Sequence, residues 1–138
     1  MIEALKADLI RDEGRKESAY QDHMGFWTIG IGHLIDERKG GKLPPHIIDA
    51  LLDHDIATAQ AQLDDKVAWW KSRPESVQLA LVQMVFQLGI GGLLKFQKML
   101  SALHAGDYAT ARKEALDSAW AKQTPERAAR VTALFTGE

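Results

Sequence analysis

Two carboxylates and a hydroxyl group lie near the start of the sequence at a spacing that could support chemistry. Glu13 precedes a glycine, and Asp22 and Thr28 follow a short way along the chain. Two carboxyl groups can share the cleavage of a glycosidic bond, one as general acid and the other as base or nucleophile. Such roles need environments that separate the two pKa values. Most acidic residues only solvate a surface, so spacing alone does not predict an enzyme.

The elements that must position these groups follow from the hydrophobic pattern. Apolar residues recur at helical spacing over residues 2–12, and Gly14 fits the glycine that commonly follows a helix. The β region is predicted over residues 18–34, with a turn at 23–25 and a strand over 26–31. The first carboxylate would then lie at a helix end, the second at the hairpin turn and the hydroxyl on the strand.

The rest of the chain is predicted to be helical. Two prolines open a long amphipathic helix over residues 45–63, and residues 75–88 are apolar nearly all round, which is typical of a central buried helix. Further helices are expected over 93–104, over 108–119 with Asp107 as N-cap, and from 125 to about 135 with Thr124 as N-cap.

These elements predict an α+β, mostly helical fold. Residues 1–138 are expected to form one domain, with lobes at about 12–50 and 64–138. The N-terminal helix joins the second lobe, and helix 45–63 connects the two lobes. A cleft between lobes is the common place for a ligand.

Composition excludes several classes of function. The formal net charge is −2 and there is no cysteine, so neither a broad nucleic-acid footprint nor a thiolate site is expected. The acidic N-terminus does not resemble a signal peptide, and no stretch looks like a stable membrane span. Synthesis in the cytoplasm is therefore expected. The histidines lack metal-ligand spacing, so neither a metal nor another cofactor is predicted.

Three motifs in order carry a resemblance to a known family. They are DEGRKESAYQDHMGFWTIGIGHL from residue 12, MVFQLG at 84–89 with Phe96 downstream, and WAKQTPERAARV at 120–131. Together they resemble the phage-type lysozymes, the T-even phage endolysins of glycoside hydrolase family 24. The resemblance covers nearly the whole chain. It implies a lysozyme-like fold with the active-site cleft between the lobes.

The resemblance implies a role for each of the three residues above. Glu13 matches the general acid, Asp22 the second carboxylate, and Thr28 a hydroxyl that helps to position water. Family enzymes are read as inverting N-acetylmuramidases, which cleave the β-1,4 bond between N-acetylmuramic acid and N-acetylglucosamine. Inversion requires room for a water between the carboxylates. A module that binds peptidoglycan without turnover, and a lytic transglycosylase, stay open as alternatives.

Further positions match family residues around the cleft. Leu34 and Phe86 match residues that line the saccharide cleft, and Gln87 lies beside them. Three others are implied to support the site: Arg127 as partner of the catalytic glutamate, and His33 with Asp55 as a histidine–aspartate pair. Arg130 matches the partner of Asp12.

The chain also departs from the T-even enzymes. The segment after residue 33 is shorter, and two cleft positions that are Ser and Asn there are Met99 and Glu114 here, which puts saccharide contacts at these positions in doubt. Glu114 is expected to alter preference near the peptide stem. The resemblance further implies a monomer that lyses a phage host by acting on peptidoglycan in the periplasm. Without a signal peptide, wall access would need a holin-type lesion or delivery by a virion or secretion device.

Overall fold

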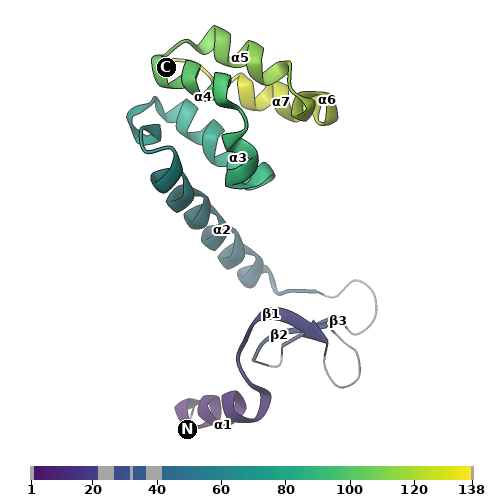
Figure 1. Ribbon diagram of the computed structural model, residues 1–138. Coiled ribbons are helices and arrows are strands. Elements are labelled where there is room, and N and C mark those ends of the chain that lie inside the picture. Colours follow the sequence, from purple (N-terminus) through teal and green to yellow (C-terminus); the bar gives the residue numbers. More distant parts are fainter. Residues whose placement is uncertain (1, 22–26, 32, 37–41, 138) are drawn as a thin grey trace. The chain divides into compact units, whose positions relative to one another are not determined.

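The computed structural model describes residues 2–21, 27–31, 33–36 and 42–137 (Figure 1). The chain divides into two compact units, Met1–Ala50 and Leu51–Glu138. The first holds helix α1 and a small antiparallel sheet; the second is helical. The α+β, mostly helical class predicted from the sequence is confirmed. That the two units form one lysozyme-like domain stays a prediction.

Helix α1 spans Ile2–Glu13 and ends where the sequence predicts. Gly14 has φ +76°, a left-handed conformation that suits glycine, and its N–H bonds to the carbonyl of Ile10 at 2.8 Å. The first candidate carboxylate is therefore the last helical residue, directly before a sharp change of chain direction.

The sheet has three antiparallel strands in the order β1-β2-β3. Strand β1 spans Lys16–Gln21, β2 spans Trp27–Gly30 and β3 spans His33–Asp36. The sheet thus begins two residues before the predicted β region of 18–34 and ends two residues after it, with a third strand that was not predicted. The predicted turn at 23–25 lies outside the described residues.

Helix α2 spans Pro45–Lys66 and starts at the predicted proline, and the 3-10 helix η1 follows at Trp70–Ser72. Only Ala59 and Leu63 of α2 are buried. At its end the indole N–H of Trp70 donates to Asp64 at 2.8 Å. This bond fixes how the chain leaves α2.

Helix α3, Glu75–Leu94, supplies the largest share of the buried residues in the second unit. The predicted stop at Gly89 is seen as a kink, with φ +73° and ψ 163°, after which the helix resumes. By length and composition, α3 is apolar enough to cross a membrane, and 33% of its apolar window is buried. The core helix of a soluble protein passes the same test.

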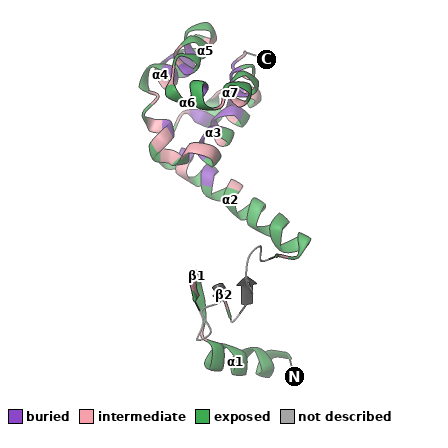
Figure 2. Cartoon of the chain, turned by 90° about the vertical axis from the view of Figure 1, so that its right-hand side faces the viewer, coloured by how far each residue is buried: buried purple, intermediate pink, exposed green. Residues whose placement is uncertain are grey.

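Four shorter helices complete the second unit, and its buried residues gather among them and α3 (Figure 2). Asp107 caps α5 as predicted, since its side chain accepts from the backbone N–H of Thr110. Thr124 holds the N-cap position of α7 as predicted, but its side chain makes no capping bond, because its hydroxyl donates to the carbonyl of Trp120. The bounds are α4 Gln97–Ala105, α5 Tyr108–Leu116, α6 Ala119–Gln123 and α7 Pro125–Thr132.

Candidate functional site

The first unit carries the candidate acid and the candidate hydroxyl. Glu13 is exposed at the end of α1, and Thr28 lies on β2 with 4% of its surface exposed. Thr28 pairs with Tyr20 on one side and with Leu34 on the other, so it occupies the central strand. A buried hydroxyl on a central strand is held in place by its neighbours, which is a requirement for positioning a reactant.

The second candidate carboxylate, Asp22, lies outside the described residues. In the sequence it follows Gln21, which ends β1 and pairs with Trp27. Leu34 and His33 belong to β3, where they pair with Thr28 and Ile29. The structure describes the backbone of these two residues.

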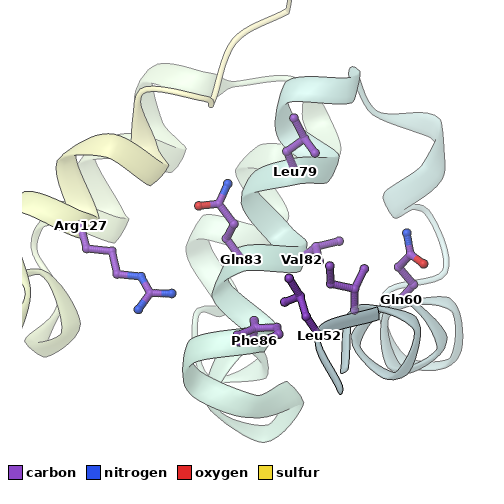
Figure 3. A pocket seen from close by; sticks show the side chains of 8 residues that line it. Leu52, Gln60, Leu79, Val82, Gln83, Phe86 and Arg127 are labelled. Carbon is purple, nitrogen blue, oxygen red and sulfur yellow. The ribbon is translucent and has the colours of Figure 1, made fainter. Parts of the chain in front are cut away.

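In the second unit, the aromatic candidate Phe86 borders an apolar hollow of about 340 Å³ (Figure 3). Phe86 lies on α3 and is 46% exposed. The candidate supporting residue Arg127 extends from α7 to the rim of the same hollow. The other lining residues come from α2 and α3 and are Leu52, Ile56, Gln60, Leu79, Val82 and Gln83.

The candidate Gln87 is fixed by an aromatic neighbour. Its Oε1 accepts from the indole N–H of Trp120 at 2.9 Å. Trp120 is 5% exposed, and the ring of Phe96 meets it edge-on with centroids 5.9 Å apart. Its oxygen is engaged, whereas its amide NH₂ group makes no hydrogen bond within the described residues and can donate to a substrate.

A tryptophan near a saccharide site can either pack in the core or stack on a sugar ring. Burial assigns Trp120 to the core, where it orients Gln87 rather than offering a face to a ligand. No local pattern reveals this hydrogen bond, because the two residues are far apart in the chain and belong to different helices.

Asp55 is exposed on α2 and lines a smaller hollow of about 210 Å³ together with Phe86. The predicted pairing of Asp55 with His33 and of Arg127 with Glu13 would each join residues from the two units, so both stay predictions. Within the described ranges, no cluster of three or more acidic, histidine or cysteine side chains could hold a metal ion.

The two positions that depart from the T-even pattern lie beside one hollow of about 320 Å³. Met99 is 1% exposed and belongs to the core, so it offers almost no surface to a ligand. Glu114 is half-buried on α5. Lys95 and Lys98 line the same hollow, and no motif in the sequence marks either lysine.

Comparison with known proteins identifies the family. The phage lysozyme family matches residues 11–135. The chain belongs to the phage lysozyme family. The "Probable T4-type lysozyme 1" of Dictyostelium discoideum is 31% identical, over 98% of this chain and 95% of that protein. The "Endolysin" of Acyrthosiphon pisum secondary endosymbiont phage 1 is 29% identical, over 85% of this chain and 78% of that protein.

A third relative is much longer. The "Pre-baseplate central spike protein Gp5" of Enterobacteria phage T4 is 36% identical over 92% of this chain, and the chain spans 26% of that protein. Family membership confirms the resemblance stated from the motifs. This phage lysozyme is therefore an enzyme of the lysozyme class, for which the substrate class is peptidoglycan.

Proposed function

We propose that this phage lysozyme is an N-acetylmuramidase that cleaves the β-1,4 bond between N-acetylmuramic acid and N-acetylglucosamine. Glu13 donates a proton to the leaving glycosidic oxygen, while Asp22 and Thr28 direct a water at the anomeric carbon from the opposite face. The attack inverts the configuration. The single observation that best supports this assignment is the burial of Thr28 on the central strand of the unit that also carries Glu13.

Glu13, Asp22 and Thr28 take different roles because their functional groups differ in chemistry. A carboxyl group can deliver a proton, a carboxylate can accept one, and a neutral hydroxyl can only orient a water through hydrogen bonds. Thr28 is flanked in the ladder by Tyr20 and Leu34, so its rotation into other positions is restricted. Leu34, Phe86 and Gln87 are proposed to hold the saccharide, the last through its free NH₂ group.

The supporting residues act on charge and position. Arg127 is proposed to pair with Glu13, and His33 with Asp55. The part of the chain that the structure describes shows no ion pair for Arg127, whose guanidinium reaches the rim of the apolar hollow (Figure 3). A guanidinium without a partner at an apolar rim favours an incoming carboxylate.

Product analysis tests the reaction. Purified peptidoglycan is incubated with the wild type and with Glu13→Gln, and the new ends are identified by mass. Reducing-end muramic acid from the wild type alone supports muramidase activity, with a rate loss of roughly 10²–10⁴ in the variant. Reducing-end N-acetylglucosamine would contradict the proposed bond. Anhydro-muramic ends would indicate a transglycosylase, and equal, negligible release by both proteins a binding module.

Stereochemistry requires a separate measurement. Proton NMR of a soluble glycan oligomer during early turnover reports which anomer forms first. Inversion of a β-linkage yields the α-anomer first, and a retaining reaction would yield the β-anomer. The β-anomer would remove Asp22 from the role of water-activating base.

The proposed setting is lysis of a bacterial host, with the monomeric enzyme acting on the wall in the periplasm after passage through a holin-type lesion. Expression in a bacterial cytoplasm, with and without a co-expressed holin, tests this route. Lysis that depends on both the holin and Glu13 supports it. Lysis without a holin would show that the protein reaches the wall by another way.

A further inference from the structure

Two adjacent tryptophans lie where the chain passes from α2 to α3, and their surroundings differ. Trp70 is 2% exposed, and its indole N–H bonds to Asp64. Trp69 is half-buried against the core, and its ring stacks on the imidazole of His104. The proposed reaction uses neither ring, so the Trp69–His104 stack is a feature of the second unit that the candidate site does not explain.

The Trp69–His104 stack joins two segments that are distant in the sequence. Trp69 directly precedes η1, whereas His104 lies in the last turn of α4. The ring centroids are 4.6 Å apart, and the ring planes are 3° from parallel. This separation lies within the roughly 6 Å over which a cation is attracted to the face of an indole. The stack can therefore respond to a positive charge on the imidazole.

His104 is placed so that its charge can change. Its side chain is exposed, and within the described ranges it makes no hydrogen bond or ion pair. Histidine is the side chain whose charge ordinarily changes between pH 5 and 8. The indole of Trp69 is therefore the contact through which a charge on this imidazole acts.

Charges on the surrounding segments act on the same imidazole. The last turn of a helix favours a cation, and His104 occupies that turn of α4. Asp107, the N-cap of α5, adds negative charge shortly after the helix end. Arg73 opposes a second cation, and its guanidinium lies 3.9 Å from where a Cβ atom would be on Gly106. Helices α3 and α5 both pack on α4, and their own charged residues are Glu75, Arg112, Lys113 and Glu114.

We propose that the Trp69–His104 stack is a pH-sensitive contact that stabilises the second unit when His104 is protonated. A protonated imidazole is a cation on the face of the indole, which attracts it more strongly than it attracts the neutral ring. This attraction outweighs the repulsion from Arg73, because the two rings are in direct contact whereas Arg73 approaches the backbone beyond the helix end. The added stability is present below the ordinary titration range of imidazole, near about pH 6.5, and is lost as the pH rises.

The neighbouring Trp70 provides an internal reference, because its contacts should not change over the same pH range. The hydrogen bond from Trp70, aided by Lys71, lowers the pKa of Asp64, so this carboxylate stays charged in mildly acidic solution. Lys71 lies 5.6 Å from the centroid of the Trp70 ring, and lysine side chains in general stay charged in this range. A pH-dependent change at this junction is therefore assigned to Trp69.

A double-mutant cycle at two pH values tests the inference. Urea unfolding of the full chain is measured at about pH 5.5 and about pH 8, on either side of the range where histidine titrates. The cycle consists of the wild type, Trp69→Leu, His104→Gln and the double variant. His104→Phe keeps a ring that cannot be charged. His54→Gln removes another exposed histidine, which makes no ring contact within the described residues, and is the matched control.

The coupling between positions 69 and 104, expressed as a ratio of unfolding equilibrium constants, should be about two- to fivefold greater at the lower pH. The stability difference between His104→Phe and His104→Gln should be the same at both pH values. His54→Gln should retain the pH dependence of the wild type. A coupling that is equal at the two pH values, or greater at the higher one, would overturn the inference.

Tryptophan fluorescence of the folded protein gives a second measurement. A protonated imidazole quenches an indole that it contacts, so the emission of the wild type should decrease as the pH falls from about 8 to about 5.5. The decrease should be absent from His104→Phe and retained in His54→Gln. An equal decrease in the wild type and His104→Phe would overturn the inference. Both measurements are made without substrate, so their outcome does not depend on the proposed hydrolase function.

Discussion

The indole N–H of Trp120 on α6 donates a 2.9 Å hydrogen bond to Oε1 of Gln87 on α3. Gln87→Leu should lower the free energy of unfolding by about 1–3 kcal/mol, because it leaves a buried N–H without an acceptor. The same variant should raise KM, since it also removes the free NH₂ group. Urea unfolding and steady-state kinetics measure the two effects. Gln87→Glu keeps the acceptor and should retain most of the stability.

The control for this prediction lies on the same helix. Gln83 is exposed at the rim of the apolar hollow, and Gln83→Leu removes an amide that makes no hydrogen bond within the described residues. It should change stability by less than about 0.5 kcal/mol. If both variants lose the same stability, the bond to Trp120 does not stabilise the protein.

A substitution at Gly14 tests whether the backbone conformation at the end of α1 positions the candidate acid Glu13. Because its φ is +76°, Gly14→Ala should destabilise the first unit by about 1–2 kcal/mol and displace Glu13. The activity of Gly14→Ala should fall by more than the decrease in the fraction of folded protein can explain. Gly91→Ala is the matched control: it lies in the resumed part of α3 with nothing near its added methyl group, and should be neutral or slightly stabilising. Full activity of Gly14→Ala would contradict this prediction.

Two substitutions at Thr28 distinguish a role of its hydroxyl group in catalysis from a role of its side chain in packing. Thr28→Val keeps the branched shape and removes the hydroxyl, so kcat should fall by roughly 10²-fold or more while the circular dichroism spectrum is retained. Thr28→Ser restores a hydroxyl and should recover much of the rate, although it leaves a small void. Equal kcat values for the two variants would remove the hydroxyl from the mechanism.

Acid stability should depend on Asp64. The hydrogen bond from the Trp70 indole, aided by Lys71, lowers the pKa of this carboxyl group below its ordinary value. A lowered folded pKa stabilises the protein above the unfolded value of about 3.9, and this contribution disappears as the pH falls through the folded pKa. Asp64→Asn should therefore lose stability at neutral pH and show a flatter decline below about pH 4. Asp65→Asn, at the same helix end, is the control in pH-dependent urea unfolding.

Two residues predicted as N-caps should respond differently. Asp107→Ala removes a carboxylate that accepts from Thr110 and should cost about 1 kcal/mol in thermal unfolding. Thr124→Ser keeps a hydroxyl that can still reach the carbonyl of Trp120 and should cost less. A larger loss from Thr124→Ser would mean that its methyl group packs more tightly than its intermediate exposure indicates.

Local chemistry explains which parts of the fold the sequence could predict. Gly14, Pro45 and Pro125 mark helix boundaries correctly, because backbone freedom and a missing N–H act within one or two residues. Asp107 shows the same for a cap. Thr124 also holds its predicted N-cap position, but its hydroxyl bonds back to Trp120 in the preceding helix α6, which no local pattern reveals.

Features that depend on contacts between residues far apart in the sequence could not be predicted from local patterns. The resumption of α3 after Gly89 depends on the packing of Leu93 in the core, which helix periodicity does not encode. The third strand extends two residues beyond the predicted β region, because its end pairs with β2. The hydrogen bond that orients Gln87, and the charges that gather beside Glu114, arise from contacts between helices. The candidate catalytic residues were predicted from the resemblance of the motifs to the family, and the experiments above test their roles.

The kink at Gly89 has a consequence for where α3 can reside. Residues 75–88 and 90–94 form separate helical stretches, and each is shorter than the roughly 20 residues that span a hydrocarbon layer. Both stretches nevertheless contribute to one core, since Met84 and Val85 before the kink and Leu93 after it are buried there, so the kink lets a single apolar segment cover that core from two directions.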